Sequence, residues 1–155
     1  MTSKNTPQTN EPSASLLLSD QLCFAVYSTM LGINKVYRKM LRALGITYPQ
    51  YLVLLVLWEH DAMTVSEIGE RLFLDSATLT PMLKRMEKLE LLQRVRAKED
   101  ERHVVISLTE KGRDLKIQAQ TVADGVFCAT ECTPTELGSI RDNLLLLRKR
   151  LFKNA

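Results

Sequence analysis

The sequence predicts a mainly α protein with a small β-ribbon, in which a winged helix-turn-helix stands between N- and C-terminal dimerisation helices. Two short amphipathic helical patterns follow one another within residues 64–90, and an alternating strand pattern follows at residues 104–108. Two consecutive short helices and a β-ribbon are the parts of a winged helix-turn-helix. The predicted organisation is a disordered tail at 1–15 and a single domain at 16–155, with dimerisation helices at 16–63 and 109–155 and the winged module at 64–108.

The N-terminal third is expected to contain two helices after the tail. The tail is polar and offers almost nothing to bury, which is typical of disorder. A long helix is expected from Ser19 or Asp20 to about residue 44, where Gly45 suits a left-handed helix end. The next helix is expected to begin at Tyr48-Pro49, since proline suits a first helical position. Its body, YLVLLVLW, has no polar face and is therefore the predicted central helix, buried on all sides.

The winged module begins with two capped helices. Thr64 and Glu67 have the spacing of a capping box, and Asp75 is an N-cap candidate for a second helix that runs to about Glu90. The polar face of the second helix carries small and hydroxyl side chains near its start and lysines farther along. A recognition helix has this arrangement, because compact groups reach base edges and cations meet phosphates, but a solvated surface helix can have it too. The candidate DNA contacts are Ser76, Ala77, Thr80, Lys84 and Lys88; the expected apolar residues are Ile68, Leu72 and Phe73 in the first helix and Leu79, Leu83, Met86 and Leu89 in the second.

The ribbon and the C-terminal helices complete the pattern. Arg94, Arg96, Lys98 and Arg102 flank a ribbon tip around residues 98–101, next to the expected recognition helix. Thr109 is expected to cap a helix that runs to roughly Cys128, and Thr133-Pro134-Thr135-Glu136 reads as a capping box for a last helix. The leucines of this last helix exceed what one small subunit can cover, so the sequence predicts a homodimer, whose two modules would read two halves of a pseudopalindromic site. Its apolar stripe is Leu137, Ile140, Leu144, Leu147 and Leu151, backed by Leu145 and Leu146.

Composition excludes several classes of protein. A net charge of +3 is only mildly basic, so positive charge must be local to matter. The chain contains neither an apolar run of about eighteen residues nor an N-terminal export pattern, so a cytoplasmic protein is expected. Three cysteines do not make a disulfide scaffold, and the two histidines have no companions at metal-ligand spacing. No metal, no cofactor and no enzymatic activity are expected, since no nucleotide fingerprint or nucleophile motif is present.

The string Asp100-x-Arg102-x-x-x-Ile106-x-Leu108-Thr109-x-x-Gly112 resembles the wing and following helix start of the MarR family of dimeric bacterial transcription regulators. The resemblance extends from about residue 18 to residue 151. It implies that Arg102 enters the minor groove of operator DNA and that Asp100 orients it. Pro81 lies inside the expected recognition helix, where it removes one backbone hydrogen bond and should bend the axis. The resemblance implies a local kink without a break, because the family often has proline at this position.

Cys23 is the candidate for redox chemistry. If Asp20 is the N-cap, Cys23 is the third residue of its helix, where free backbone N–H groups and the helix dipole favour a thiolate that attacks peroxides. Packing on the apolar stripe is the other interpretation, as for most free cysteines. The segments LCFAVYSTM and GITYPQYLVLLVLWE resemble the organic hydroperoxide-sensing branch of the MarR family, in which two tyrosine hydroxyls hold the sensor cysteine. The matching residues are Cys23, Tyr37 and Tyr48.

Two further expectations follow for the thiols. Fourteen residues (23 to 37) along one helix correspond to roughly 21 Å, so a Cys23–Tyr37 contact must cross the dimer interface. In the two-cysteine type of this branch, a cysteine near the C-terminal end of the other subunit resolves the oxidised sensor. Cys128 is the favoured candidate for that role and Cys132 the lesser one, and both can also be incidental thiols.

The sequence thus predicts a cytoplasmic, homodimeric repressor that binds double-stranded operator DNA and is released by organic hydroperoxides through oxidation of Cys23 and an intersubunit disulfide. One alternative is a MarR-type repressor released by a small aromatic ligand, bound between the winged module and the dimer helices, without thiol chemistry. A more distant alternative is a thiol peroxidase that acts through Cys23. Against the peroxidase, neither arginine nor threonine lies near Cys23 in the sequence to polarise a peroxide, and the winged module would have no role.

Overall fold

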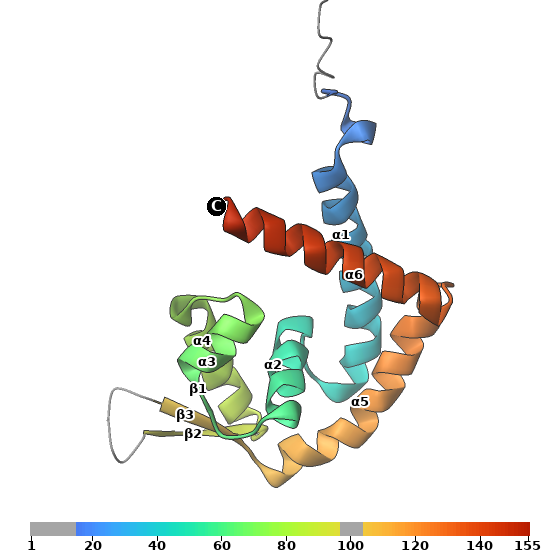
Figure 1. The fold of residues 1–155 in the computed structure, drawn as a ribbon. Coiled ribbons are helices and arrows are strands. Elements are labelled where there is room, and N and C mark those ends of the chain that lie inside the picture. Colours follow the sequence, from blue (N-terminus) through green and yellow to red (C-terminus); the bar gives the residue numbers. More distant parts are fainter. Residues whose placement is uncertain (1–14, 97–103) are drawn as a thin grey trace, which may run out of the picture. The chain divides into compact units, whose positions relative to one another are not determined.

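The structure is a computed structural model that describes residues 15–96 and 104–155 (Figure 1). The chain divides after Ile33 into two units, and each is described by itself. The predicted fold class, mainly helical with a small antiparallel sheet, is confirmed. The elements are η1 (Leu18–Asp20), α1 (Leu22–Leu41), η2 (Arg42–Leu44), α2 (Tyr48–Glu59), β1 (Met63–Thr64), α3 (Val65–Leu72), α4 (Ser76–Lys88), β2 (Leu92–Arg96), β3 (Val104–Leu108), α5 (Glu110–Ala129) and α6 (Pro134–Lys153).

The first long helix begins later than predicted. Asp20 ends a short 3₁₀ turn, in which its N–H donates to the carbonyl of Leu17 at 3.1 Å. Gln21 has an extended backbone, and its carbonyl accepts the first helical hydrogen bond, from the N–H of Ala25 at 3.1 Å. Gln21 therefore precedes the helix, and the expectation that Asp20 is the N-cap is wrong. Cys23 is the second residue of α1 rather than the third, but it still lies in the first turn.

The end of α1 also differs in detail from the prediction, whereas the start of α2 agrees with it. The α-helix ends at Leu41 because the chain tightens into the 3₁₀ turn η2, which Gly45 ends as predicted with a φ of 68°. Thr47 then caps α2, since its N–H donates to Oε1 of Gln50 at 2.9 Å. Helix α2 therefore begins at Tyr48-Pro49, as predicted, with Pro49 as its second residue.

Helix α2 is the central helix of its unit, as predicted, and packs against α3, α4 and α5. The expectation that it is buried on all sides is wrong at Leu55, which remains 37% exposed in the single chain. Among the described residues, no single helix is both long and apolar enough to cross a membrane; α1 with η2 and α2 meets that length and composition only as a bent pair. The core that surrounds α2 includes Leu41, Ile46, Tyr51, Val53, Leu54, Val56, Leu57, Ile68, Leu79, Leu83, Met86, Ile106 and Leu108.

The predicted caps of α3 and α4 are confirmed. The N–H of Thr64 donates to Oε2 of Glu67 at 2.7 Å, and the N–H of Glu67 donates back to Oγ1 of Thr64 at 3.2 Å. In α4, the N–H of Thr78 donates to Oδ1 of Asp75 at 2.7 Å. Pro81 lies inside α4 without breaking it, as expected.

Two predicted core residues are exposed because each lies where a helix ends. Phe73 ends α3 in the left-handed region, at a φ of 56°, and its side chain is 55% exposed against the ring of Phe152. Helix α4 ends at Lys88, two residues before the predicted end, and Leu89 is 40% exposed beyond it. The backbone takes a positive φ at Phe73 and at Glu90, directly after Leu89, so regular helix ends there and both apolar side chains are left exposed.

The sheet has three antiparallel strands in the order β1-β3-β2, one more than predicted. Strand β3 is central: its Ile106 pairs with Met63 of β1, and its Leu108 pairs with Leu92 of β2. The predicted alternation in β3 is confirmed, since Ile106 and Leu108 are buried and Val104 is partly buried. The two-residue strand β1 is too short to produce an alternating pattern, so it could not be predicted.

Helices α5 and α6 begin at their predicted caps, Thr109 and Thr133. Helix α5 buries one face, which contains Leu115, Ala119 and Val122. In α6, all of which the structure describes, no residue is buried. Its stripe is open in the single chain, with Ile140 51% exposed and Leu151 60% exposed. An apolar helix face of this length fits the predicted interface with a second copy.

Candidate functional site

The outer face of α4 is the candidate DNA-reading surface. Leu79, Leu83 and Met86 are fully buried, so they fix which side of the helix faces the core. The opposite side places small groups at the N-terminal end and cations farther along, as predicted. Of the predicted contacts, Ser76, Ala77, Lys84 and Lys88 are exposed and Thr80 is partly buried.

Helix α4 is held at its start by a charged cap. The carboxylate of Asp75 accepts hydrogen bonds from the backbone N–H and the hydroxyl of Thr78, which lower its pKa below the usual value. Asp75 therefore stays ionised near neutral pH and continues to cap the helix. This keeps the first turn, with Ser76 and Ala77, in a defined conformation.

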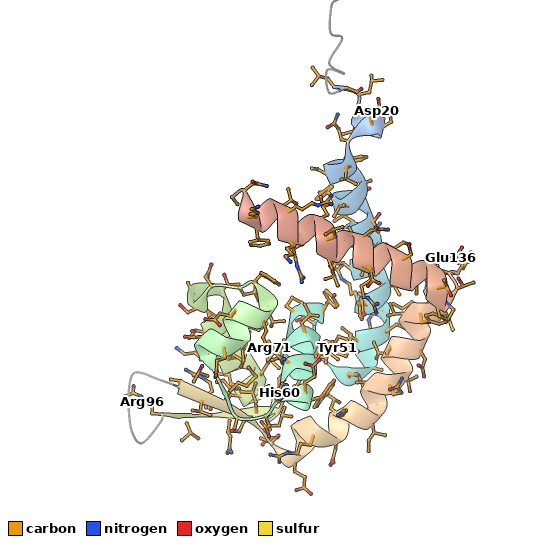
Figure 2. The ribbon with its side chains drawn as sticks, in the orientation of Figure 1. Asp20, Tyr51, His60, Arg71, Arg96 and Glu136 are labelled. Carbon is orange, nitrogen blue, oxygen red and sulfur yellow. The ribbon has the colours of Figure 1, made fainter. Side chains whose placement is uncertain are left out.

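The ribbon beside α4 is only partly the basic tip that the sequence predicts. Arg96 is exposed at the end of β2, as Figure 2 shows. Arg94 is different: its side chain is 20% exposed, and its Nη1 lies 3.6 Å from Oε2 of Glu87. Glu87 Oε1 also accepts the N–H of Arg94 at 3.1 Å, so Arg94 braces β2 against α4. Arg94 therefore contributes to the packing of the ribbon on α4, and its guanidinium adds little exposed positive charge. The predicted DNA contacts Asp100 and Arg102, with Lys98, lie outside the described residues.

The three thiols lie at helix ends. Cys23 is exposed in the first turn of α1, and Cys128 is exposed in the last turn of α5. Cys132 follows in the turn before α6, partly buried, with its Sγ 3.3 Å from the carbonyl oxygen of Thr130. Exposure makes Cys23 and Cys128 accessible to a peroxide or to another thiol, whereas Cys132 is engaged with its own turn.

Tyr37 and Tyr48, the tyrosines predicted to hold the sensor thiol, lie together. Tyr37 comes from α1 and Tyr48 from the start of α2, and their ring centroids are 4.3 Å apart. Burial and the two neighbouring tyrosines raise the pKa of Tyr37 to about 12, and burial raises the pKa of Tyr48. Both hydroxyls therefore keep their protons near neutral pH. They can donate hydrogen bonds to a thiolate or to a peroxide oxygen.

Sequence reasoning missed Tyr51, which extends this pair into a cluster. Its ring centroid lies 5.7 Å from that of Tyr37 and 6.2 Å from that of Trp58, and the residue is 3% exposed (Figure 2). The signal was its spacing: Tyr51 follows Tyr48 by three residues, which places both on one side of α2. In the described part of the chain, no three histidine, cysteine or acidic side chains lie together as a metal site would require.

The chain resembles known proteins over most of its length. Residues 35–118 match the family model described as transcriptional regulator SarA/Rot. The chain is 46% identical over 136 residues to the organic hydroperoxide resistance transcriptional regulator of Bacillus subtilis (strain 168), which covers 88% of this chain and 92% of that protein.

Two solved structures of AbfR, a Staphylococcus epidermidis protein, have a similar fold. Reduced AbfR bound to DNA is 38% identical, with a TM-score of 0.70, and the match covers 87% of this chain and 95% of that one. The disulfide-formed AbfR is 39% identical, with a TM-score of 0.62, and covers 84% and 91%.

Proposed function

Since the chain belongs to the MarR/SarA type of winged-helix transcriptional regulators, we propose that it is a homodimeric, cytoplasmic repressor that senses organic hydroperoxides through Cys23. The observation that supports this most directly is the meeting of Tyr37 and Tyr48 at 4.3 Å, which forms a pair of protonated hydroxyl donors. Such donors can hydrogen-bond to a thiolate or to a peroxide oxygen, so they suit a repressor that acts through a reactive thiol. The protein would act by binding and release and would not turn over a substrate.

DNA binding would use α4 and the ribbon. The N-terminal end of α4 carries two small, exposed side chains, Ser76 and Ala77, so the helix can approach base edges closely in the major groove. Lys84 and Lys88 lie farther along the same helix and would contact phosphates. Arg102 would enter the minor groove from the wing, with Asp100 orienting its guanidinium. The DNA-bound structure of reduced AbfR supports this use of the shared fold.

Sensing would proceed in two balanced steps. The Cys23 thiolate attacks the terminal oxygen of the hydroperoxide, an S–O bond forms, the O–O bond breaks, and the alkoxide takes a proton to leave as an alcohol. Cys23 is then a sulfenic acid, oxidised by two electrons. The thiolate of Cys128 of the partner subunit attacks its sulfur, an S–S bond forms, and hydroxide leaves as water after taking a proton. The disulfide-formed structure of AbfR supports a disulfide state in this fold.

Dimerisation is supported by the uncovered face of α6. Its leucines and the apolar residues of α1 are exposed in one chain, for example Leu22 at 58% and Leu144 at 44%. A second copy that covers these faces would bring the first helix of one subunit toward the C-terminal helices of the other. The disulfide would then connect the subunits and change the spacing of the two winged modules.

The decisive experiment compares the wild type with Cys23→Ser and Cys132→Ser. Operator binding is measured by fluorescence anisotropy, with a duplex that the reduced protein selects from random-sequence DNA, before and after cumene hydroperoxide. We expect Cys23→Ser to bind like the wild type and to stay bound after peroxide, because serine cannot form a sulfenic acid. Cys132→Ser is the matched control and should be released normally. If Cys23→Ser is still released, sensing does not use this thiol and release by an aromatic ligand becomes the better account.

A further inference from the structure

Asp61 joins three parts of the chain that are distant in sequence. It lies between α2 and β1, and its Oδ1 accepts hydrogen bonds from the N–H groups of Ala62 and Leu108, both at 2.8 Å. Its Oδ2 lies 3.0 Å from Nη2 of Arg113, in the first turn of α5. One carboxylate therefore connects the end of α2, the last residue of the central wing strand and the start of α5.

A second set of contacts holds the same turn of α5. Trp58 of α2 donates from Nε1 to the carbonyl of Gly112 at 2.9 Å, and Lys111 donates from Nζ to the carbonyl of Leu89 at 2.9 Å. Gly112 packs so closely that a Cβ there would lie 2.0 Å from the carbonyl oxygen of Leu91. We call this region the α5 joint: Trp58, Asp61, Leu108, Lys111, Gly112 and Arg113.

The α5 joint leaves the start of α5 little freedom relative to the wing. Helix α5 continues without interruption from Glu110 to Ala129, so Cys128 lies at its far end. Fifteen residues (113 to 128) of helix correspond to about 22 Å, and a helix of that length moves as a rigid rod. A displacement at Cys128 would therefore rotate the N-terminal end of α5. The contacts of the α5 joint would determine how much of that rotation is transmitted to β3.

We propose that Asp61 is a positioning residue that transmits movement of α5 to the wing, so that the redox state of the thiols sets the orientation of the DNA-reading surface. The proposal rests on the redox function proposed above. Asp61 itself touches neither thiol nor, by this account, DNA: it acts through Leu108 of β3 and Arg113 of α5.

The charge of Asp61 suits this role. Although partial burial alone would raise its pKa, the N–H groups of Leu108 and Ala62 and the guanidinium of Arg113 hold the pKa below the usual value. The carboxylate is therefore ionised near neutral pH, and its ionic contact with Arg113 is present under the conditions in which a sensor works.

The test uses three variants that retain most of the fold. Asp61→Asn keeps an oxygen for the N–H groups of Ala62 and Leu108 but loses the charge that faces α5. Arg113→Gln removes the partner cation, whose side chain is 58% exposed and therefore contributes little to the core. Lys116→Gln is the matched control: it removes an exposed cation one turn farther along α5, whose Nζ lies 3.5 Å from the carbonyl oxygen of Trp58, but it leaves the ion pair of Asp61 with Arg113 in place.

For each variant, operator affinity is measured in the reduced protein and after cumene hydroperoxide, and non-reducing electrophoresis measures the intersubunit disulfide. We expect all variants to form the disulfide. In the wild type and Lys116→Gln, oxidation should lower the affinity by the same factor, whereas in Asp61→Asn and Arg113→Gln that factor should shrink by about fivefold or more. A residue with only a structural role would lower both affinities together and leave the ratio unchanged.

Two opposing results have different meanings. If the wild type is released and Asp61→Asn shows the same ratio of reduced to oxidised affinity, the role of Asp61 is refuted and the proposed function stands. If the wild type forms the disulfide and keeps its operator, the proposed redox function is refuted, and the coupling through Asp61 with it.

Discussion

The tyrosine pair shows how single residues acquire a role from their surroundings. Tyr37 and Tyr48 are separated by ten intervening residues, yet their rings meet at 4.3 Å. Partial burial raises the pKa of each hydroxyl, and the neighbouring rings of Tyr48 and Tyr51 raise that of Tyr37 further, to about 12. Since a raised tyrosine pKa favours the protonated form, the hydroxyl donors persist until the pH rises toward that value.

Removing either hydroxyl should slow the oxidation of Cys23. We expect Tyr37→Phe and Tyr48→Phe to react with cumene hydroperoxide about tenfold or more slowly, because a hydrogen bond to a charged sulfur or a developing alkoxide is lost. Stopped-flow mixing followed by labelling of the sulfenic acid measures the rate. Tyr51→Phe is the control, since it removes a hydroxyl from the same cluster and should react like the wild type. If Tyr37→Phe, Tyr48→Phe and Tyr51→Phe all react at the wild-type rate, the hydroxyls take no part in the oxidation of Cys23.

At the scale of elements, the proposed function assigns DNA binding jointly to α4 and the wing. Buried Leu79, Leu83 and Met86 orient α4, so its cations project from the opposite side. Arg94 of β2, by contrast, is paired with Glu87 of α4 and helps to pack the ribbon against that helix. The charge available to DNA in this region is therefore smaller than the number of arginines and lysines in the sequence implies.

This division predicts different effects of mutation. Lys84→Gln and Lys88→Gln should each weaken operator binding and lower the slope of log affinity against log salt by about 1, because each removes one phosphate contact.

Arg102→Ala should weaken binding by about 1–3 kcal/mol while the dimer stays folded. Titrations at several salt concentrations measure both effects, with Lys153→Gln at the end of α6 as a control for lost charge. Unchanged affinity in the Arg102 variant would exclude the wing from the mechanism.

At the scale of the whole molecule, the leucines of α6 are exposed in one chain and need a second copy to cover them. Cys23 and Cys128 are both exposed in one chain, in the first turn of α1 and the last turn of α5. Cys132 is partly buried, and its thiol is hydrogen-bonded to the carbonyl oxygen of Thr130 in the same turn. It is therefore less accessible than Cys128 for disulfide formation with a partner cysteine. These surroundings favour Cys128 as the resolving residue, in agreement with the preference drawn from the sequence.

Peptide mapping of the peroxide-treated dimer should find Cys23 joined to Cys128 of the partner subunit. A disulfide needs α-carbons within about 7 Å, so closing it from a larger separation would displace the C-terminal helices. Cys128→Ser should abolish the covalent dimer on non-reducing gels, and Cys132→Ser should leave it intact. A Cys23–Cys132 link, or a covalent dimer that survives in Cys128→Ser, would contradict this assignment.

The sequence by itself determined the features whose causes are local. The caps at Thr64, Asp75 and Thr133 each depend on a residue three positions away, so they were predictable from spacing alone. The helix and strand periodicities depend on neighbours within a few turns, which is why the order of the elements was predicted apart from β1 and the short 3₁₀ turns η1 and η2.

The tertiary structure decided what depends on residues far apart in the chain. Asp61 bonds to residues 47 and 52 positions later, and no local pattern identifies such partners. Periodicity predicted Phe73 and Leu89 as core residues, but each lies where a helix ends and is exposed. Arg94 was predicted to flank a basic ribbon tip, and only the tertiary structure shows that its guanidinium pairs with Glu87 of α4. Local hydrogen bonds and burial periodicity specify the elements, whereas contacts between elements specify which of their side chains remain free to act.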